Sequence, residues 1–212
     1  MGRLLFLSLA LAFATALSAG AAPVYDNLVD VQSVDPTIRV DLRYARADNI
    51  TGHALYPPST PALVRPETAV RLAKAQAYLR ARHYGLKIWD AYRPLNAQME
   101  LWAKSHNGAY VADPEAGNGS LHTWGVAVDV TLVDAQGRDL PMPTKFDEFT
   151  PAARLHYEGN DPLILYNLKV LQGAMHHGGF YGLRTEWWHF IALDWKKYAP
   201  IREAKKIREQ AN

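Results

Sequence analysis

Four residues in the second half of the chain have the types and spacing of a metal site: His122, Asp129, Glu186 and His189. Imidazole nitrogens and carboxylate oxygens are ligands that zinc accepts, and a catalytic zinc site usually takes three protein ligands and leaves the fourth position to water. His122 and Asp129 provide two such ligands, and His189 is the best third candidate. Glu186 precedes His189 by three positions and brings a carboxylate close to the metal without having to bind it. The chain contains no Cys, so any zinc must be bound by nitrogen and oxygen.

This spacing requires two interruptions of regular strand structure. In a straight strand His122 and Asp129 would stand roughly 23 Å apart, too far to share an ion. Gly125 lies between them and permits a tight bend, so we expect His122 in a loop and Asp129 in the strand that follows. Residues three apart on a regular strand face opposite sides. Glu186 and His189 can therefore converge only if a bulge or the end of a loop falls near 185–187.

Hydrophobic periodicity predicts the elements that position these residues. Alternation of valines with Ala127, Asp129 and Thr131 predicts a strand in which Asp129 points away from the valine face. A helix that begins at Pro66 should end at Gly85 and should carry its small and apolar positions at Ala69, Val70, Ala73 and Ala77. The remaining patterns predict extended pieces within 30–44, a strand at 86–92, a helix at 95–104, a helix at 162–177 capped by Asp161, and a strand at 186–191.

Helices of different lengths between short strands indicate an α+β domain, in which helices cover a small, mainly antiparallel sheet. Residues 1–21 have the charged start, the short apolar run and the small residues of a signal peptide, so we expect 22–212 to form one domain that is secreted or periplasmic. We expect no membrane association after cleavage. The 23 basic and 21 acidic residues give a net charge of only +2, which offers no electrostatic case for nucleic acid or anionic lipid.

Longer motifs extend across nearly the whole of the expected domain. The chain contains Ser120-x-His122 followed by Asp129, and a later Glu186-Trp-Trp-His189. It also contains Asp41-Leu-Arg-Tyr44 before Asn49-Ile-Thr-Gly52, then Trp89-Asp-Ala-Tyr-Arg93-Pro94 and Phe146-Asp147. In the first set of motifs, Ser-x-His with Asp and a later Glu-x-x-His, the chain resembles the wide group of D,D-carboxypeptidases and hedgehog-like domains. In the second set it resembles one branch of that group, the zinc D-alanyl-D-alanine dipeptidases of the vancomycin-resistance type.

The resemblance implies a hedgehog-like D,D-peptidase fold with one zinc ion per chain, bound by His122, Asp129 and His189. It makes Glu186 the general acid/base and Arg93 the stabiliser of the transition state. It also places three residues in the wall of the dipeptide pocket, namely Tyr44, Ser120 and Asp147. The implied reaction is hydrolysis of D-alanyl-D-alanine to two D-alanines, and the implied partner is this small D,D-dipeptide.

Elementary chemistry agrees with these roles. A carboxylate beside the metal can take a proton from water and pass it to the leaving amine, and a fixed cation such as Arg93 can hold an oxyanion. Asp147 is a suitable partner for the free ammonium of a dipeptide. Two alternatives stay open: a zinc D,D-carboxypeptidase or endopeptidase that acts on peptidoglycan peptides, and a non-catalytic zinc-binding hedgehog-like interaction module. The physiological role and the oligomeric state are left open as well.

Overall fold

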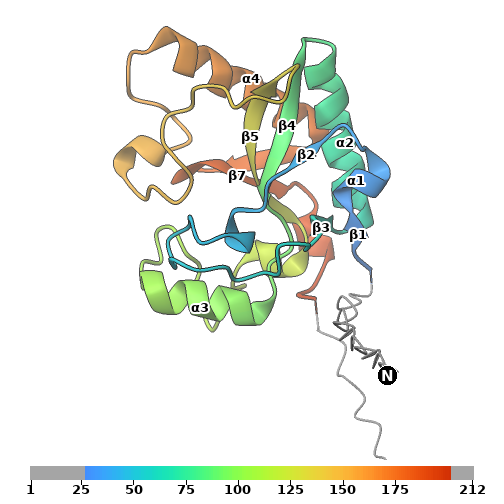
Figure 1. Cartoon of the computed structure of the whole chain (residues 1–212). Coiled ribbons are helices and arrows are strands. Elements are labelled where there is room, and N and C mark those ends of the chain that lie inside the picture. The colour runs from blue at the N-terminus through green and yellow to red at the C-terminus, as the bar shows by residue number, and fades with distance from the viewer. Residues whose placement is uncertain (1–26, 202–212) are drawn as a thin grey trace, which may run out of the picture.

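The main sheet has five strands and runs through the centre of the protein (Figure 1). The structure is a computed structural model that describes residues 27–201, so the expected signal peptide at 1–21 lies outside the described residues. The strand order is β2 (Arg39–Val40), β4 (Tyr84–Asp90), β5 (Ala127–Asp134), β7 (Glu186–Ala192) and β6 (Phe180–Leu183). β2 pairs with β4 in parallel, and every other pair in this sheet is antiparallel. The predicted α+β class with a small, mainly antiparallel sheet is confirmed.

Two long helices pack against each other and against the sheet, and a third lies apart from them. α2 (Pro66–Arg80) contacts α4 (Pro162–Gly178) and β4, and α4 also contacts β5 and β6. α3 (Leu95–Ser105) follows β4 and lies away from this pair (Figure 1). The smaller elements are α1 (Val31–Val34), the two-stranded sheet of β1 (Val29–Asp30) and β3 (Leu63–Val64), and four 3-10 helices, η1 (Arg43–Ala45), η2 (Leu121–Trp124), η3 (Pro151–Ala153) and η4 (Trp195–Lys197).

Local signals predict the ends of α4 and α3 well. The Asp161 carboxylate accepts the backbone N–H groups of Leu163 and Ile164, and Pro162 is the first residue of α4. The helix ends at Gly178, and Gly179 follows with φ of 87°, a left-handed conformation that favours glycine. α3 covers the predicted range with one further residue.

The prediction for α2 is wrong in its end and in its buried face. The helix ends at Arg80, and β4 already begins at Tyr84, so Gly85 is part of a strand. Ala69 is buried as predicted, but Val70 is 49% exposed and Ala77 is also exposed. The face that packs into the core consists of Thr68, Ala69, Leu72, Ala75, Gln76 and Leu79.

Gln76 explains why an apolar pattern misplaces this face. Its side-chain oxygen accepts the backbone N–H of Leu86 at 2.8 Å, and its amide nitrogen donates to the backbone oxygen of Thr37 at 3.2 Å. These bonds satisfy a polar side chain that is only 2% exposed. A search for apolar residues assigns Gln76 to the solvent face, although these distant partners make it a core residue.

The expected extended pieces at 30–44 are only partly confirmed. Val31–Val34 is a helical turn capped by Asp30, and only Arg39–Val40 joins the main sheet. Ile38 and Leu42 are buried on either side of this short strand, which agrees with the alternation. Within residues 27–201 we find no helix with the length and apolar character needed to cross a bilayer.

Candidate active site

The register of the central strands places three functional side chains in one row. Asp129 on β5 lies opposite Asp90 on β4 and opposite His189 on β7. Residues directly opposite one another in neighbouring strands project from the same face of a sheet. The valines on either side of Asp129 in the sequence therefore project from the other face, as the alternation predicts, and both are fully buried.

His122 joins this row from outside the sheet because the chain turns sharply after it. It lies in η2, and Gly125 ends that turn with φ of 70°. A Cβ at Gly125 would also lie 3.3 Å from the backbone nitrogen of Arg65 and 2.8 Å from the Leu28 side chain, so the close packing adds to the preference for glycine. The predicted bend is confirmed. His122 Nδ1 donates to the backbone oxygen of Ala91 at 2.7 Å, and this bond selects the tautomer in which Nε2 faces the ligand group.

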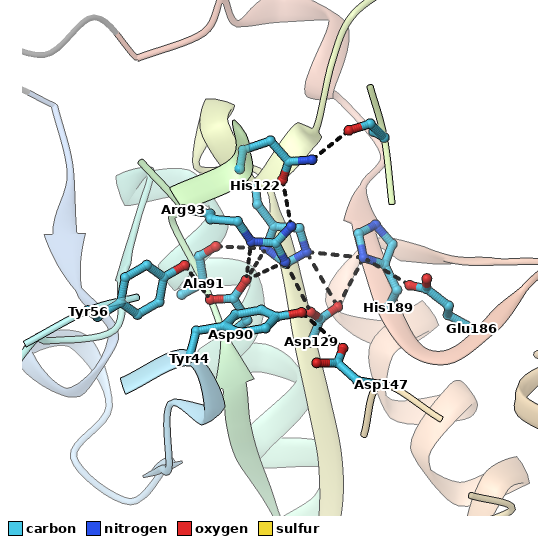
Figure 2. A network of polar contacts seen from close by, with 12 residues as sticks. Tyr44, Tyr56, Asp90, Ala91, Arg93, His122, Asp129, Asp147, Glu186 and His189 are labelled. Carbon is cyan, nitrogen blue, oxygen red and sulfur yellow. Dashed lines mark hydrogen bonds and ion pairs between the residues drawn. The ribbon is translucent and has the colours of Figure 1, made fainter. Parts of the chain in front are cut away.

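The three predicted ligands have the spacing that a tetrahedral ion requires. His122 Nε2 lies 3.1 Å from His189 Nδ1 and 3.4 Å from Asp129 Oδ1, and His189 Nδ1 lies 3.0 Å from Asp129 Oδ1. Ligand atoms each bonded to one zinc at about 2.0–2.1 Å stand about 3.3 Å apart in a tetrahedron. Figure 2 shows the three side chains turned toward a common point. Two nitrogens and one carboxylate oxygen at these distances form a group that fits zinc.

Burial favours a neutral imidazole at His189. Desolvation lowers the pKa of His189 below its ordinary value, and the residue is only 9% exposed. A neutral ring is the form that binds a metal, because the ligating nitrogen must carry a free electron pair.

Glu186 reaches the ligand group because β7 is irregular. Leu183 of β6 pairs with Glu186, whereas the preceding Gly182 already pairs with Phe190, so residues 187–189 form a bulge. A break is present on this strand, but it lies later than the predicted 185–187 and overlaps that range only at Trp187. Glu186 Oε2 lies 3.9 Å from His189 Nδ1. Burial raises the pKa of Glu186 well above its ordinary value, and the charge of Asp129 raises it further.

Arg93 lies behind the ligands and is fixed by two buried partners. Its Nε and Nη2 both donate to Asp90 Oδ2, at 2.9 and 2.6 Å, and its Nη1 donates to the side-chain oxygen of Gln98 at 2.7 Å. Burial acts to lower the pKa of Arg93, but the Asp90 carboxylate together with Tyr44, Tyr56 and Asp129 outweighs it, so the pKa is raised well above its ordinary value and the charge is retained. Arg93 Nη2 stands 3.7 Å from Asp129 Oδ2. A guanidinium has five N–H groups, and three of them donate to Asp90 and Gln98.

Tyr44 and Asp147 form a second polar pair at the site. Tyr44 donates its hydroxyl to Asp147 Oδ1 at 2.9 Å, and the backbone N–H of Ile50 donates to Oδ2 at 3.3 Å. Desolvation by burial raises the pKa of Asp147 to about 7 despite these bonds. Asp147 has φ of 58°, a conformation that Asp tolerates better than most residues.

All eight site residues predicted from the sequence line one cavity of about 260 Å³. They are Tyr44, Arg93, Ser120, His122, Asp129, Asp147, Glu186 and His189. Ser120 is 7% exposed. Sequence reasoning missed other parts of the site. Asp90 and Gln98 hold Arg93, and the aromatic residues Tyr110 and Phe149 form part of the wall. Asp90 could have been found, because it lies inside the Trp-Asp-Ala-Tyr-Arg motif three residues before Arg93.

Comparisons with known proteins agree on one family. A family model described as D-ala-D-ala dipeptidase, of the M15 peptidases, matches residues 25–206. A D-alanyl-D-alanine dipeptidase of Escherichia coli K12 is 37% identical over 164 residues, which cover 77% of this chain and 83% of that protein. A D-alanyl-D-alanine dipeptidase of Enterococcus faecium is 28% identical over 175 residues, covering 74% of this chain and 87% of that protein.

Proposed function

Because the chain belongs to the D-ala-D-ala dipeptidase family of M15 peptidases, we propose that it hydrolyses free D-alanyl-D-alanine to two molecules of D-alanine. The observation that carries this proposal is the group formed by His122, Asp129 and His189. Their ligand atoms have tetrahedral spacing, and they lie at a small cavity that Glu186 also lines. A metal group and a buried carboxylate at one cavity are the parts that hydrolysis of a peptide bond requires.

His122, Asp129 and His189 would hold one zinc ion per chain. When bound, zinc polarises a carbonyl group and lowers the pKa of a water molecule. The protein's own contribution is to orient these ligands. The Ala91 carbonyl selects the tautomer of His122 that presents Nε2, and strand pairing fixes Asp129 beside His189.

Glu186 acts as the general acid/base. It is 4% exposed and stands beside the ligand group, where a bound metal cation would favour its charged form. In that form it can take a proton from the attacking water and deliver it to the leaving amine. Arg93 supplies the fixed positive charge for the oxygen that becomes negative as water adds to the carbonyl. Asp90 and Gln98 use three of its five N–H groups and hold the other two in place, so the charge does not have to reorganise during the reaction.

Asp147 binds the free ammonium group of the dipeptide, and the Tyr44 hydroxyl orients the Asp147 carboxylate. Ser120 lines the same cavity. Burial raises the pKa of Tyr44 well above its ordinary value, so its hydroxyl stays protonated and donates to Asp147. An incoming ammonium favours the charged form of Asp147, because an opposite charge at short distance lowers the pKa of a carboxyl group.

The size of the cavity supports a dipeptide over a longer wall peptide. Its volume of about 260 Å³ lies below the range of about 300–1,000 Å³ that is typical of sites for drug-sized ligands. The decisive experiment incubates the zinc-loaded protein with free D-alanyl-D-alanine and, separately, with a peptidoglycan pentapeptide, and measures D-alanine release. Release from the free dipeptide alone supports the proposal. Faster release from the pentapeptide would identify a D,D-carboxypeptidase, and no hydrolysis of either would favour a non-catalytic zinc module.

We also propose that the protein is exported, to the periplasm or the exterior, where D,D-peptides of the cell wall occur. The support is the composition of residues 1–21. N-terminal sequencing of protein recovered from the periplasm or the medium tests this. A chain that starts at residue 22 is expected, and recovery of an intact N-terminus from the cytoplasm would contradict it.

A further inference from the structure

Two aromatic rings from different loops stack on each other at the wall of the cavity. Tyr110 lies between α3 and η2, and Phe149 lies between β5 and η3. Their ring centroids are 4.8 Å apart and their planes differ by only 16°, a stacked arrangement that is favourable for aromatic pairs. Both residues are half-buried, and both line the cavity. The stack therefore joins two walls that do not belong to the sheet.

The loop that carries Tyr110 is anchored on both sides of this residue. The backbone N–H groups of Tyr110 and Val111 both donate to the backbone oxygen of Asn107, at 3.1 and 3.0 Å. On the other side, the side-chain amide of Gln98 donates to the backbone oxygen of Ala112 at 2.6 Å. Gln98 is completely buried. Tyr110 is therefore held in place by its backbone as well as by its ring.

Phe149 is anchored beside the residue to which we assign the substrate's ammonium group. Its backbone N–H donates to the backbone oxygen of Asp147 at 2.9 Å, so both residues belong to one tight turn. The ring of Phe149 also lies against Trp188 of β7, with centroids 6.5 Å apart, and Trp188 is only 1% exposed. The position of Phe149 is thus fixed relative to both Asp147 and the bulged strand.

The amino nitrogen of a dipeptide is the atom through which a longer peptide would continue. A substrate extended there carries an acyl group on the nitrogen that we assign to Asp147. That group needs space beside Asp147, and Phe149 belongs to the same turn as Asp147. We propose that the Tyr110–Phe149 stack closes this end of the cavity and restricts hydrolysis to dipeptides with a free amino group. The inference rests on the proposed dipeptidase function and assigns its specificity to two named side chains.

The test compares free D-alanyl-D-alanine with N-acetyl-D-alanyl-D-alanine as substrates of the zinc-loaded protein. For each variant the ratio of kcat/KM for the acetylated substrate to kcat/KM for the free dipeptide is measured. Tyr110→Ala and Phe149→Ala should each raise this ratio at least about tenfold, equivalent to about 1.4 kcal/mol. Tyr110→Phe is the matched control, because it keeps the ring and loses only the hydroxyl, and it should leave the ratio within about twofold of wild type.

A combined Tyr110→Ala/Phe149→Ala variant should gain little over the better single variant, because removal of either ring already breaks the stack. Circular dichroism and zinc content verify that each variant is folded and loaded. Phe149→Leu replaces Phe149→Ala if the latter fails to fold.

The outcomes separate this inference from the proposed function. If wild type hydrolyses the free dipeptide and both alanine variants keep its ratio, the stack is not the barrier and the inference is overturned, while the dipeptidase function stands. The same conclusion follows if wild type hydrolyses the acetylated substrate as fast as the free one. If wild type hydrolyses neither substrate, the proposed function fails and the inference fails with it.

Discussion

Replacement of Arg93 by alanine should have two effects that the structure allows to be measured apart. The guanidinium group neutralises the Asp90 carboxylate through two hydrogen bonds to one oxygen, at 2.9 and 2.6 Å. It also lines the cavity in which the substrate is proposed to bind. Arg93→Ala therefore removes a structural partner from a buried acid and, at the same time, removes the cation proposed for the transition state.

The loss of stability is set by the burial of Asp90. Its side chain has no exposed surface, so Arg93→Ala leaves a buried carboxylate without its counter-charge. Breaking a buried ion pair in this way typically costs about 3–5 kcal/mol. The Tyr56 hydroxyl, which donates to Asp90 Oδ1 at 3.1 Å, compensates for part of this loss, so we expect a value toward the lower end.

The loss of rate should be about 100-fold or more in kcat, or about 2.7 kcal/mol, as for removal of other oxyanion donors. KM should change little, because the negative charge on the carbonyl oxygen is absent in the ground state. Arg93→Lys should recover only part of the rate, because a single ammonium group does not reproduce the planar fork that reaches Asp90, Gln98 and the substrate together.

A double variant separates the two effects. Asp90→Asn combined with Arg93→Ala removes the unpaired charge, so it should be more stable than Arg93→Ala alone but equally slow. Urea unfolding gives the free energies, and steady-state kinetics on free D-alanyl-D-alanine, at a temperature where every variant is folded, gives kcat and KM. Recovery of kcat together with stability would show that Arg93 is only structural. A rise in KM with kcat untouched would show that Arg93 binds the ground state, and either result refutes the role proposed here.

Three further predictions concern the metal, the base and the ammonium partner. Alanine substitution of any one metal ligand should cause loss of zinc, because two remaining ligands hold the ion poorly; the variants are His122→Ala, Asp129→Ala and His189→Ala. Metal analysis after dialysis measures the zinc content. Full occupancy in all three variants would contradict the ligand assignment. Glu186→Gln should retain both zinc and the native fold, but its kcat should fall by several orders of magnitude, because an amide cannot carry the proton. If this variant instead loses zinc, and the fraction that still contains zinc remains active, Glu186 is a ligand and not the base. Burial raises the pKa of Asp147 to about 7, so the contribution of Asp147 to the stability of the metal-free protein should fall as pH rises from about 4 to about 7, where the unfolded chain has released the proton that the folded state retains. Asp147→Asn should flatten this fall in urea unfolding, and parallel curves for the variant and wild type would disprove the shift.

Several features of the fold and of the site can be predicted from the sequence because they depend on neighbours along the chain. The bend at Gly125 is a property of one residue's backbone, and it is confirmed by φ of 70°. The same is true of the cap at Asp161, whose carboxylate accepts N–H groups two and three residues away. Even the irregularity before His189 could be inferred, because a period of two does not allow Glu186 and His189 to share a face.

Local sequence is sufficient to predict the residue types of the candidate metal ligands, the turn that brings His122 back and the strand pattern of Asp129. The tertiary structure alone decided the row of Asp90, Asp129 and His189, because sheet register depends on the packing of both faces of the sheet. The same holds for Gln76, which local polarity assigns to solvent and which hydrogen bonds to distant backbone groups bury. It also holds for the contact between Tyr110 and Phe149, because the folding of the whole chain brings their loops together and no periodicity links residues in separate loops.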